Sequence, residues 1–426
     1  MNSNFEFLRG DFPVLANFGE LAEKYCYSDS NSSLMKLGMI GETIVNLMFT
    51  YDRIPLPKEN TAAVRINVLV RNGLLTRDLA TILHGLRKIR NKAVHENYTS
   101  IDDSKKFLPM AYGICEWFMQ TYGDWNYLHK DFVMPEENIV TDLIDKKEEE
   151  RKEAELTKLA EKTASISPVI STEERKKQAN KVANQRPKTE AETRFLIDEQ
   201  LRMVGWEADT ENIRYSKGIR PSKGRNLAIA EYPTNSTIGN RGYADYALFV
   251  GEKLVGIIEA KAIHKDIPSV IDYQAKDYPR CIRKEDEKYV INTWGEFKVP
   301  FTFATNGRSY LEQYKTKSGI WFLDLRKPDN SPMALHGWMS PDGMIELLAT
   351  DIEEKNKELK EMSYDLLTDK NGLNLRPYQL NAIKAAEEAV ISGRQTALLA
   401  MATGERGIFV TGGRNSGFTR VSEALS

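Results

Sequence analysis

The stretch that decides the fold of this chain is GYADYALFVGEKLVGIIEAKA, residues 242–262. Two apolar runs rich in β-branched and aromatic residues flank a turn at residues 251–253, and this pattern predicts a β-hairpin. Side chains two residues apart on a strand lie on one face of the sheet. Glu259 and Lys261 are therefore expected to project together, whereas Ala260 between them is expected to enter the core.

An acidic residue on the partner strand completes this pattern. Asp245 lies in the first strand, so an acidic pair faces across the hairpin, with a lysine two residues further on. Two carboxylates supply the hard oxygen ligands that Mg²⁺ prefers, and the Ala260 carbonyl is a further candidate ligand. Such a metal polarises a phosphate and lowers the pKa of bound water, while the Lys261 ammonium orients the nucleophile or offsets developing charge. The residues therefore indicate metal-dependent phosphodiester hydrolysis, with Asp245 and Glu259 as the metal ligands.

The rest of the chain divides into regions of different composition. Leu79, Ile82 and Leu86 recur at the spacing of an amphipathic helix, and similar patterns predict a bundle of helices at the N-terminus. Charged residues then dominate, which predicts a solvated helix followed by a tether. Short β-type runs that alternate with helical ones predict a mixed α/β domain. We expect a multidomain α and α/β protein with a helical bundle (1–132), a charged helical linker (133–188), the mixed α/β domain (189–350) and a segment of two helices and an apolar run (351–426).

Composition excludes several classes of protein. A chain of 426 residues has room for roughly two to four domains. Lys and Arg number 59 and Asp and Glu 61, so the net charge of −2 gives no sign of nucleic-acid binding, and any basic surface must be local. Three separated cysteines, Cys26, Cys115 and Cys281, fit a reducing compartment. The sequence shows no signal peptide or membrane-spanning run, so a cytoplasmic protein without membrane contact is expected.

The hairpin and its flanks resemble the PD-(D/E)xK nuclease core, which consists of a helix, a strand, a hairpin and a return helix. On the preceding helix, Glu192 stands where that family often carries an additional acidic residue, with Glu190 as the alternative. Downstream, Gln274 and Tyr278 match the Q-x-x-x-Y element of the return helix. The resemblance implies that these residues join the hairpin acids and lysine in catalysis. It also implies that the helical face of Gln274 and Tyr278 borders the hairpin and supports the positioning of DNA.

A longer series of segments extends the resemblance. The segments EAETRFLIDEQLRMVGW, AIAEYPT, GYADYALFV, IIEAKA, QAKDYPR, FTFATNGR and IWFLDLR resemble, in this order, the nuclease region of the R subunit of type I restriction endonucleases. The resemblance covers about residues 190–340. It implies Mg²⁺-dependent cleavage of double-stranded DNA within a restriction system, with modification and specificity subunits as partners. It indicates no DNA target sequence.

The C-terminal segment resembles the start of a superfamily 2 DNA translocase. LRPYQLNAI is similar to the motif in which a glutamine, here Gln379, reads the adenine of ATP. A helicase-like, ATP-binding phosphate loop would continue from MATG as TGKT, whereas Glu405 and Arg406 follow Gly404 here and the loop lysine is absent. We therefore expect an incomplete translocase segment over 351–426, in which ATP-driven translocation is lost by truncation and ATP is not used.

The N-terminal bundle carries a motif of its own. Arg90, Asn91 and His95 resemble the RNxxxH signature of HEPN domains, which include ribonucleases and inert accessory modules. In an active pair His95 acts as general base or acid and Arg90 stabilises the phosphate, but five positions on a straight helix separate them by about 140°. Two alternatives to a DNA endonuclease stay open. One is a HEPN ribonuclease whose α/β domain binds nucleic acid, and the other is a non-catalytic remnant that docks on a modification complex.

Overall fold

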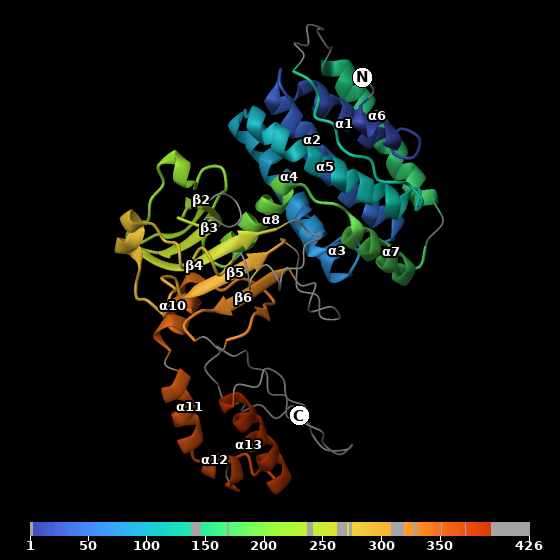
Figure 1. Cartoon of the computed structure of the whole chain (residues 1–426). Coiled ribbons are helices and arrows are strands. Elements are labelled where there is room, and N and C mark those ends of the chain that lie inside the picture. The colour runs from blue at the N-terminus through green and yellow to red at the C-terminus, as the bar shows by residue number, and fades with distance from the viewer. Residues whose placement is uncertain are drawn as a thin grey trace. The chain divides into compact units, whose positions relative to one another are not determined.

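The computed structural model describes residues 3–137, 146–167, 170–236, 242–261, 271, 275–307, 319–327, 330–350, 352–370 and 372–392. The chain separates into two units, Met1–Trp338 and Met339–Ser426. Figure 1 labels helices of both units and strands β2 to β6 of the first.

The first unit begins with a bundle of helices whose apolar faces form one core. After η1 (Asn4–Leu8), its helices are α1 (Pro13–Tyr25), α2 (Ser30–Tyr51), α3 (Ala62–Arg71), α4 (Arg77–Glu96) and α5 (Ile101–Tyr122). The side chains of Asp29, Thr61 and Ser100 cap three of these helices by accepting a backbone N–H of the first turn. Leu79 and Ile82 are buried, as the helical period requires. The helical character predicted for this region is confirmed.

Two charged helices, α6 (Lys146–Ile166) and α7 (Thr172–Gln185), follow the bundle. The first segment is a helix with mostly exposed side chains, as predicted, but the tether expected after it is wrong, because α7 is a helix that packs on the bundle. Ala164 and Ala179 are buried in the core of the bundle, and the Lys36 ammonium pairs with Glu153. The guanidinium of Arg175, which is 2% exposed, lies over an aromatic ring of α5. This polar sequence packs because its small side chains fit into the core and its buried charged side chains have partners of opposite charge. The composition of the segment does not reveal these contacts.

Helix α8 (Glu190–Met203) leads into a seven-stranded mixed sheet. The strands lie in chain order and are β1 (Glu207–Ala208), β2 (Asn226–Pro233), β3 (Tyr243–Val250), β4 (Lys253–Ala260), β5 (Phe301–Thr305), β6 (Ile320–Asp324) and β7 (Met333–Ala334). β1 with β2 and β4 with β5 are parallel, and the remaining neighbours are antiparallel. Strands β2 to β6 confirm the predictions made from apolar runs. β1 and β7 were not predicted, because strands of two residues leave no such run.

Side chains cover both faces of this sheet. On one face, the Tyr246 hydroxyl donates to Asp198 of α8 at 3.0 Å. On the other face, Ala247 and Ile257 belong to a cluster that Tyr278 completes. The sheet is therefore buried on two sides, which explains why its strands read as nearly continuous apolar runs.

The described part of the second unit is helical. Its helices are α10 (Pro341–Ala349), α11 (Ile352–Glu361), α12 (Asp365–Thr368) and α13 (Pro377–Ile391). The Tyr364 hydroxyl donates to Glu387, and the Lys384 ammonium lies 4.8 Å from the centre of the Tyr364 ring. The two helices expected here are confirmed, whereas the apolar run at residues 396–404 lies outside the described residues. Among the helices that the structure describes in both units, none is long and apolar enough to cross a membrane.

Candidate active site

A β-bulge sets which side chains of the β3–β4 hairpin face each other. Next to the two-residue turn, Phe249 pairs with Leu254, whereas the next residue of β3, Leu248, pairs with Gly256. Val255 is therefore an extra residue of β4, and the pairing shifts by one residue at this point. A one-residue shift moves the following side chains to the opposite face of a strand. The shifted register pairs Tyr246 with Ile258, so the next position places Asp245 opposite Glu259.

Asp245 is buried in β3, and both of its carboxylate oxygens accept hydrogen bonds. Arg194 of α8 donates through Nη2 to Oδ1 at 2.7 Å. The backbone N–H of Ala260 donates to Oδ2, also at 2.7 Å. Bonds that involve an ionised group are stronger than neutral ones. Asp245 is therefore held in one orientation at the end of β4.

Glu259 is fully buried, and one of its carboxylate oxygens is left open. Oε1 accepts a bond from the Lys261 ammonium, whereas Oε2 has no hydrogen-bond donor among the described residues. Burial, and after it the charge of Asp245, raises the pKa of Glu259 to about 7, and Lys261 opposes this rise. The strand register, which places Asp245 opposite Glu259, accounts for this effect of one carboxyl group on the other. Buried acids with strongly shifted pKa values cluster at functional sites.

Lys261 lies on the face of Glu259 and bonds its carboxylate, so the ammonium and the acid project together. The Lys261 side chain is 17% exposed, which leaves its ammonium within reach of a ligand. The expectation for Ala260 is wrong, because this residue is half-buried while Glu259 is fully buried. Both faces of the sheet are covered here, so the alternation of side chains does not separate core from solvent.

The two acidic residues of α8 have different partners. Glu192 is 2% exposed, and both of its carboxylate oxygens accept bonds from the guanidinium of Arg186. Glu190 is exposed and pairs with Arg194 Nε at 3.2 Å. Since Arg194 also bonds Asp245, this arginine connects Glu190 to the hairpin. Glu192 is not connected to the hairpin in this way, because Arg186 occupies both of its carboxylate oxygens.

Tyr278 lies on the face of the sheet that Glu259 shares. It is fully buried in one cluster with Ile257, which is two residues from Glu259 on β4. Residues 275–280 form turns, so the helix expected around Tyr278 is not observed there. Gln274 lies outside the described residues, and a shared face of Gln274 and Tyr278 stays a prediction.

Sequence reasoning missed Arg194, which bonds both Asp245 and Glu190. Its Nη1 is buried and has no hydrogen-bond partner among the described residues. Four residues separate it from Glu190, a spacing that places both on one face of a helix. This spacing was the signal available in the sequence.

A second missed residue, Glu231 of β2, lies opposite Asp245 in the strand register. Its φ is 48°, in the left-handed region that residues with a side chain rarely adopt. Its carboxylate pairs with Arg214. Strained backbone of this kind clusters at functional sites, and no pattern in the sequence marks it.

The donor set of the hairpin fits a divalent cation with oxygen ligands. The open Oε2 of Glu259 and the neighbouring Asp245 carboxylate are hard oxygens, which Mg²⁺ prefers. Over the described ranges, no group of three or more His, Cys, Asp or Glu side chains is arranged to hold a metal. Mg²⁺ accepts one or two carboxylates and retains water and phosphate as further ligands. The pair therefore suits Mg²⁺ better than a metal that needs a complete cage of protein ligands.

Arg90 and His95 of α4 have separate surroundings. Arg90 pairs with Glu42 at 3.2 Å and lines a cavity in the bundle. His95 is exposed and is not part of the cavity lining. Within this chain, the described contacts do not bring the two side chains into one site.

Gln379 lies in the first turn of α13. Its Oε1 accepts the backbone N–H of Arg376 at 3.0 Å, a contact that caps the helix. The residues from MATG onward, including Gly404, lie outside the described residues. Reading of an adenine by Gln379 therefore stays a prediction.

Known proteins resemble this chain over most of its length. The family described as type I restriction enzyme EcoKI endonuclease subunit second domain matches residues 207–348. The type I restriction enzyme EcoKI endonuclease subunit of Escherichia coli (strain K12) is 31% identical to the chain over 94% of its length, and the chain spans 40% of this relative. No solved structure matches the chain. Over nearly all of its own length, the chain is therefore similar to the R subunit of a type I restriction endonuclease.

Proposed function

We propose that this chain cleaves double-stranded DNA, as an endonuclease subunit of a restriction system, at the site formed by Asp245, Glu259 and Lys261. The observation that supports this is the buried acid pair of the hairpin, with an open Oε2 on Glu259. Arg194 and Lys261 balance the two negative charges, yet neither donates to Oε2. A buried acceptor without a donor costs about 1 to 3 kcal/mol, which a bound cation would offset.

Each hairpin residue has a role in this proposal. Asp245 and Glu259 would hold Mg²⁺, which when bound polarises a phosphate oxygen and lowers the pKa of a coordinated water. The Ala260 N–H keeps Asp245 oriented toward the site. The Lys261 ammonium orients the attacking water or offsets negative charge that develops on the phosphate.

Arg194 is a positioning residue for the acids. It holds Asp245 through Nη2, while its buried Nη1 keeps a donor available. A guanidinium binds phosphate oxygens through paired N–H groups. We infer that the charge of Arg194, held beside Asp245, stabilises a phosphate of DNA as it approaches the acids.

The partners of the proposal follow from the family. The relative is named an endonuclease subunit. We therefore extend the proposal to modification and specificity subunits as partners. Because the net charge of the chain is −2, its contact with DNA depends on local basic groups such as Lys261 and Arg194.

The experiment compares Glu259→Ala with Glu252→Ala, a control glutamate exposed in the turn of the same hairpin. The purified chain, alone and with the modification and specificity subunits of its system, is incubated with plasmid DNA and Mg²⁺ or Mn²⁺. We expect the Glu259 variant to lose roughly a hundredfold or more in cleavage rate, because it loses a metal ligand. Calorimetric titration with Mn²⁺ should show weakened binding in the Glu259 variant and unchanged binding in the control.

Other outcomes separate the alternatives. Cleavage of DNA by Glu259→Ala at the wild-type rate would contradict the proposal. RNA cleavage that survives Glu259→Ala and disappears in His95→Ala would favour a HEPN ribonuclease. Wild-type protein that assembles with its partners but neither binds Mn²⁺ nor cleaves nucleic acid would favour a non-catalytic docking remnant.

A further inference from the structure

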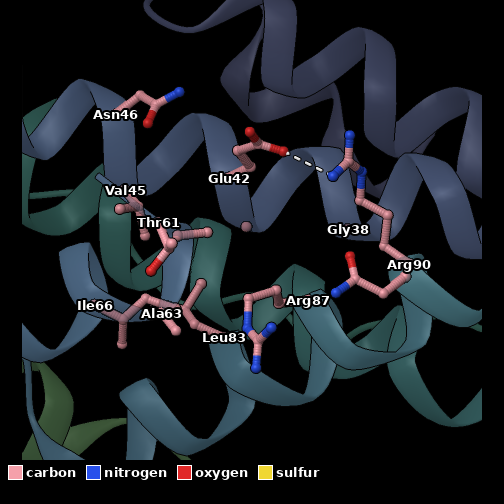
Figure 2. Close-up of a pocket in the computed structure, with 13 residues that line it drawn as sticks. Gly38, Glu42, Val45, Asn46, Thr61, Ala63, Ile66, Leu83, Arg87 and Arg90 are labelled. Atoms are coloured by element: carbon pink, nitrogen blue, oxygen red, sulfur yellow. Dashed lines mark ion pairs between the residues drawn. The ribbon is translucent and has the colours of Figure 1, made fainter. Parts of the chain in front are cut away.

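The helical bundle holds a cavity of about 370 Å³ between α2, α4 and the start of α3. Figure 2 shows the side chains that line it. Its volume lies within the range of roughly 300 to 1,000 Å³ typical of pockets for small molecules. The cavity lies apart from the β3–β4 hairpin, because its lining comes from helices of the bundle alone. An inference about it is therefore independent of the proposed DNA cleavage.

The charge of the cavity lining is unbalanced. Two arginines of α4 and one acid of α2 line it. Glu42 pairs with Arg90 at 3.2 Å, the contact drawn as a dashed line in Figure 2. Arg87 is half-buried, forms no ion pair among the described residues, and its Nε has no hydrogen-bond partner there. The guanidinium lines the cavity without an acid of its own, so its charge is available to an anion.

The groups near Arg87 do not supply that negative charge. His84 lies one turn before it on α4, and burial, and after it the charges of Arg87 and Lys88, lowers the pKa of His84. His84 is therefore neutral near pH 7, and Lys88 pairs with Glu199 of α8 at 3.0 Å. The positive charge of Arg87 is left without compensation from the described chain.

The first turn of α3 adds donors to the same cavity. Thr61, Ala62 and Ala63 line it, and Thr61 caps the helix by accepting the N–H of Val64 at 3.3 Å. The first N–H groups of a helix have no partner within it. They carry partial positive charge and bind phosphate or carboxylate groups. The helix start and Arg87 therefore favour an anion from two independent elements.

The remaining walls favour an apolar body. Val45, Ile66 and Leu83 line the cavity together with two glycines of α2. At Gly41, a Cβ atom would lie 3.3 Å from Leu83, so the absence of a side chain keeps this wall open. The cavity holds more than ten times the roughly 30 Å³ that a water molecule occupies in the liquid. A lone inorganic anion would leave most of this volume empty.

We propose that this cavity binds a small phosphate monoester of nucleoside size. Its phosphate lies against Arg87 and the first turn of α3, and its apolar body lies against Val45, Ile66 and Leu83. A guanidinium matches the geometry of phosphate oxygens. Pockets for small molecules combine apolar walls with a few polar groups in this way.

The proposal also accounts for part of the RNxxxH motif. Arg90 and Asn91 line the cavity, whereas His95 is exposed outside it. Arg90 is held by Glu42, and Asn91 is half-buried beside it. These two residues therefore frame the binding site and add an amide that can bond a ligand.

The experiment titrates the full chain with adenosine monophosphate, adenosine and inorganic phosphate, by calorimetry. We expect saturable binding of adenosine monophosphate, with adenosine and phosphate each at least tenfold weaker. Arg87→Gln should weaken the binding of adenosine monophosphate roughly tenfold or more, because it removes a charged hydrogen bond. The matched control is Arg77→Gln, an exposed arginine at the start of the same helix, which should bind as the wild type does.

A second variant protects the test against a folding defect of the first. Ala63→Phe fills the cavity from its wall and leaves the charges unchanged, and it should also abolish binding. Thermal unfolding and circular dichroism establish that each variant is folded. Absence of saturable binding in the wild type, or equal affinity in Arg87→Gln, would overturn the proposal. Tenfold tighter binding of a 5′-phosphorylated trinucleotide than of adenosine monophosphate would overturn the assignment to a small molecule.

Discussion

The β3–β4 hairpin and the cavity of the helical bundle carry opposite charges, and each contains a buried polar atom without a hydrogen-bond partner among the described residues. Within the residues that the structure describes, a buried oxygen of Glu259 in the hairpin has no donor, and a buried nitrogen of Arg87 in the cavity lining has no acceptor. The difference lies in the surroundings. The hairpin acids are already paired with Arg194 and Lys261, whereas Arg87 has no acid in the described chain. A cation at the hairpin must therefore compete with protein cations, while an anion in the cavity meets a charge that is already available.

The largest effect is expected at Lys261, because in our proposal its ammonium acts directly in the cleavage step. Lys261→Ala should reduce DNA cleavage by roughly 10²- to 10⁴-fold, since it removes the group that assists proton transfer or charge development. It should leave Mn²⁺ affinity nearly unchanged, because an ammonium is not a metal ligand. Single-turnover cleavage and calorimetry measure the two quantities, with Lys253→Ala, an exposed lysine at the start of β4, as control. Full cleavage activity in Lys261→Ala would show that β4 is the wrong strand.

A smaller effect is expected at Arg194, whose removal leaves Asp245 buried without its cation. Arg194→Gln should lower the free energy of unfolding by about 2 to 3 kcal/mol in the absence of metal. Saturating Mn²⁺ should reduce this deficit, since the ion supplies the missing positive charge. Arg225→Gln, which breaks a surface pair with Glu207, should cost less than about 1 kcal/mol. A deficit at Arg194 that is the same with and without Mn²⁺ would separate this arginine from the metal.

The pH dependence of stability tests the acidic half of the comparison. The pKa of Glu259 is raised in the folded chain to about 7, from an ordinary value of 4.5. The contribution of Glu259 to the free energy of unfolding of the wild type is therefore fully present below about pH 4.5, and it is lost as the pH rises through 7. Without metal, Glu259→Gln should be more stable than the wild type at pH 8 by on the order of 1 to 3 kcal/mol, and the difference should vanish near pH 4. Denaturant unfolding in a chelator measures it, and a difference that is constant with pH would contradict the assignment.

The corresponding change in the basic cavity should have the smallest effect and no pH dependence. Arg87→Met removes an unpaired nitrogen and retains much of the side-chain volume. It should raise the free energy of unfolding by about 0.5 to 1 kcal/mol at every pH from about 5 to 8, because a guanidinium does not titrate there. Arg77→Met, on the exposed part of α4, should change it by less than about 0.5 kcal/mol. Destabilisation by Arg87→Met would show that Arg87 has a structural partner in solution.

The fold could be predicted where burial leaves a clear pattern. Strands β2 to β6 are buried on both faces and appear as apolar runs in the sequence. The packing of α6 and α7 could not be predicted, because the surface they bury consists of small residues such as Ala164 and of charges with distant partners, such as Lys36 with Glu153. Such pairs are long-range contacts, and composition says nothing about them.

The candidate site could be predicted in its residue types and only partly in its geometry. The spacing of Glu259 and Lys261 fixes their common face. The meeting of Asp245 and Glu259 does not follow from spacing, because a regular hairpin with a two-residue turn would pair Asp245 with Ile258. The four-residue spacing could have paired Arg194 with Glu190, but its bond to Asp245 joins distant parts of the chain and could not be assigned from the sequence. In the bundle, the motif identified Arg90, whereas the unpaired Arg87 became visible only in three dimensions.

The bulge at Val255 also makes the hairpin tolerant of a change in length. If Val255 were deleted, the two-residue turn would set one continuous register, and this register again pairs Asp245 with Glu259. The loss would be felt in packing, because Val255 is fully buried. Related chains that are one residue shorter at this point can therefore preserve the acid pair. Alignments that place a gap here need not imply a damaged site.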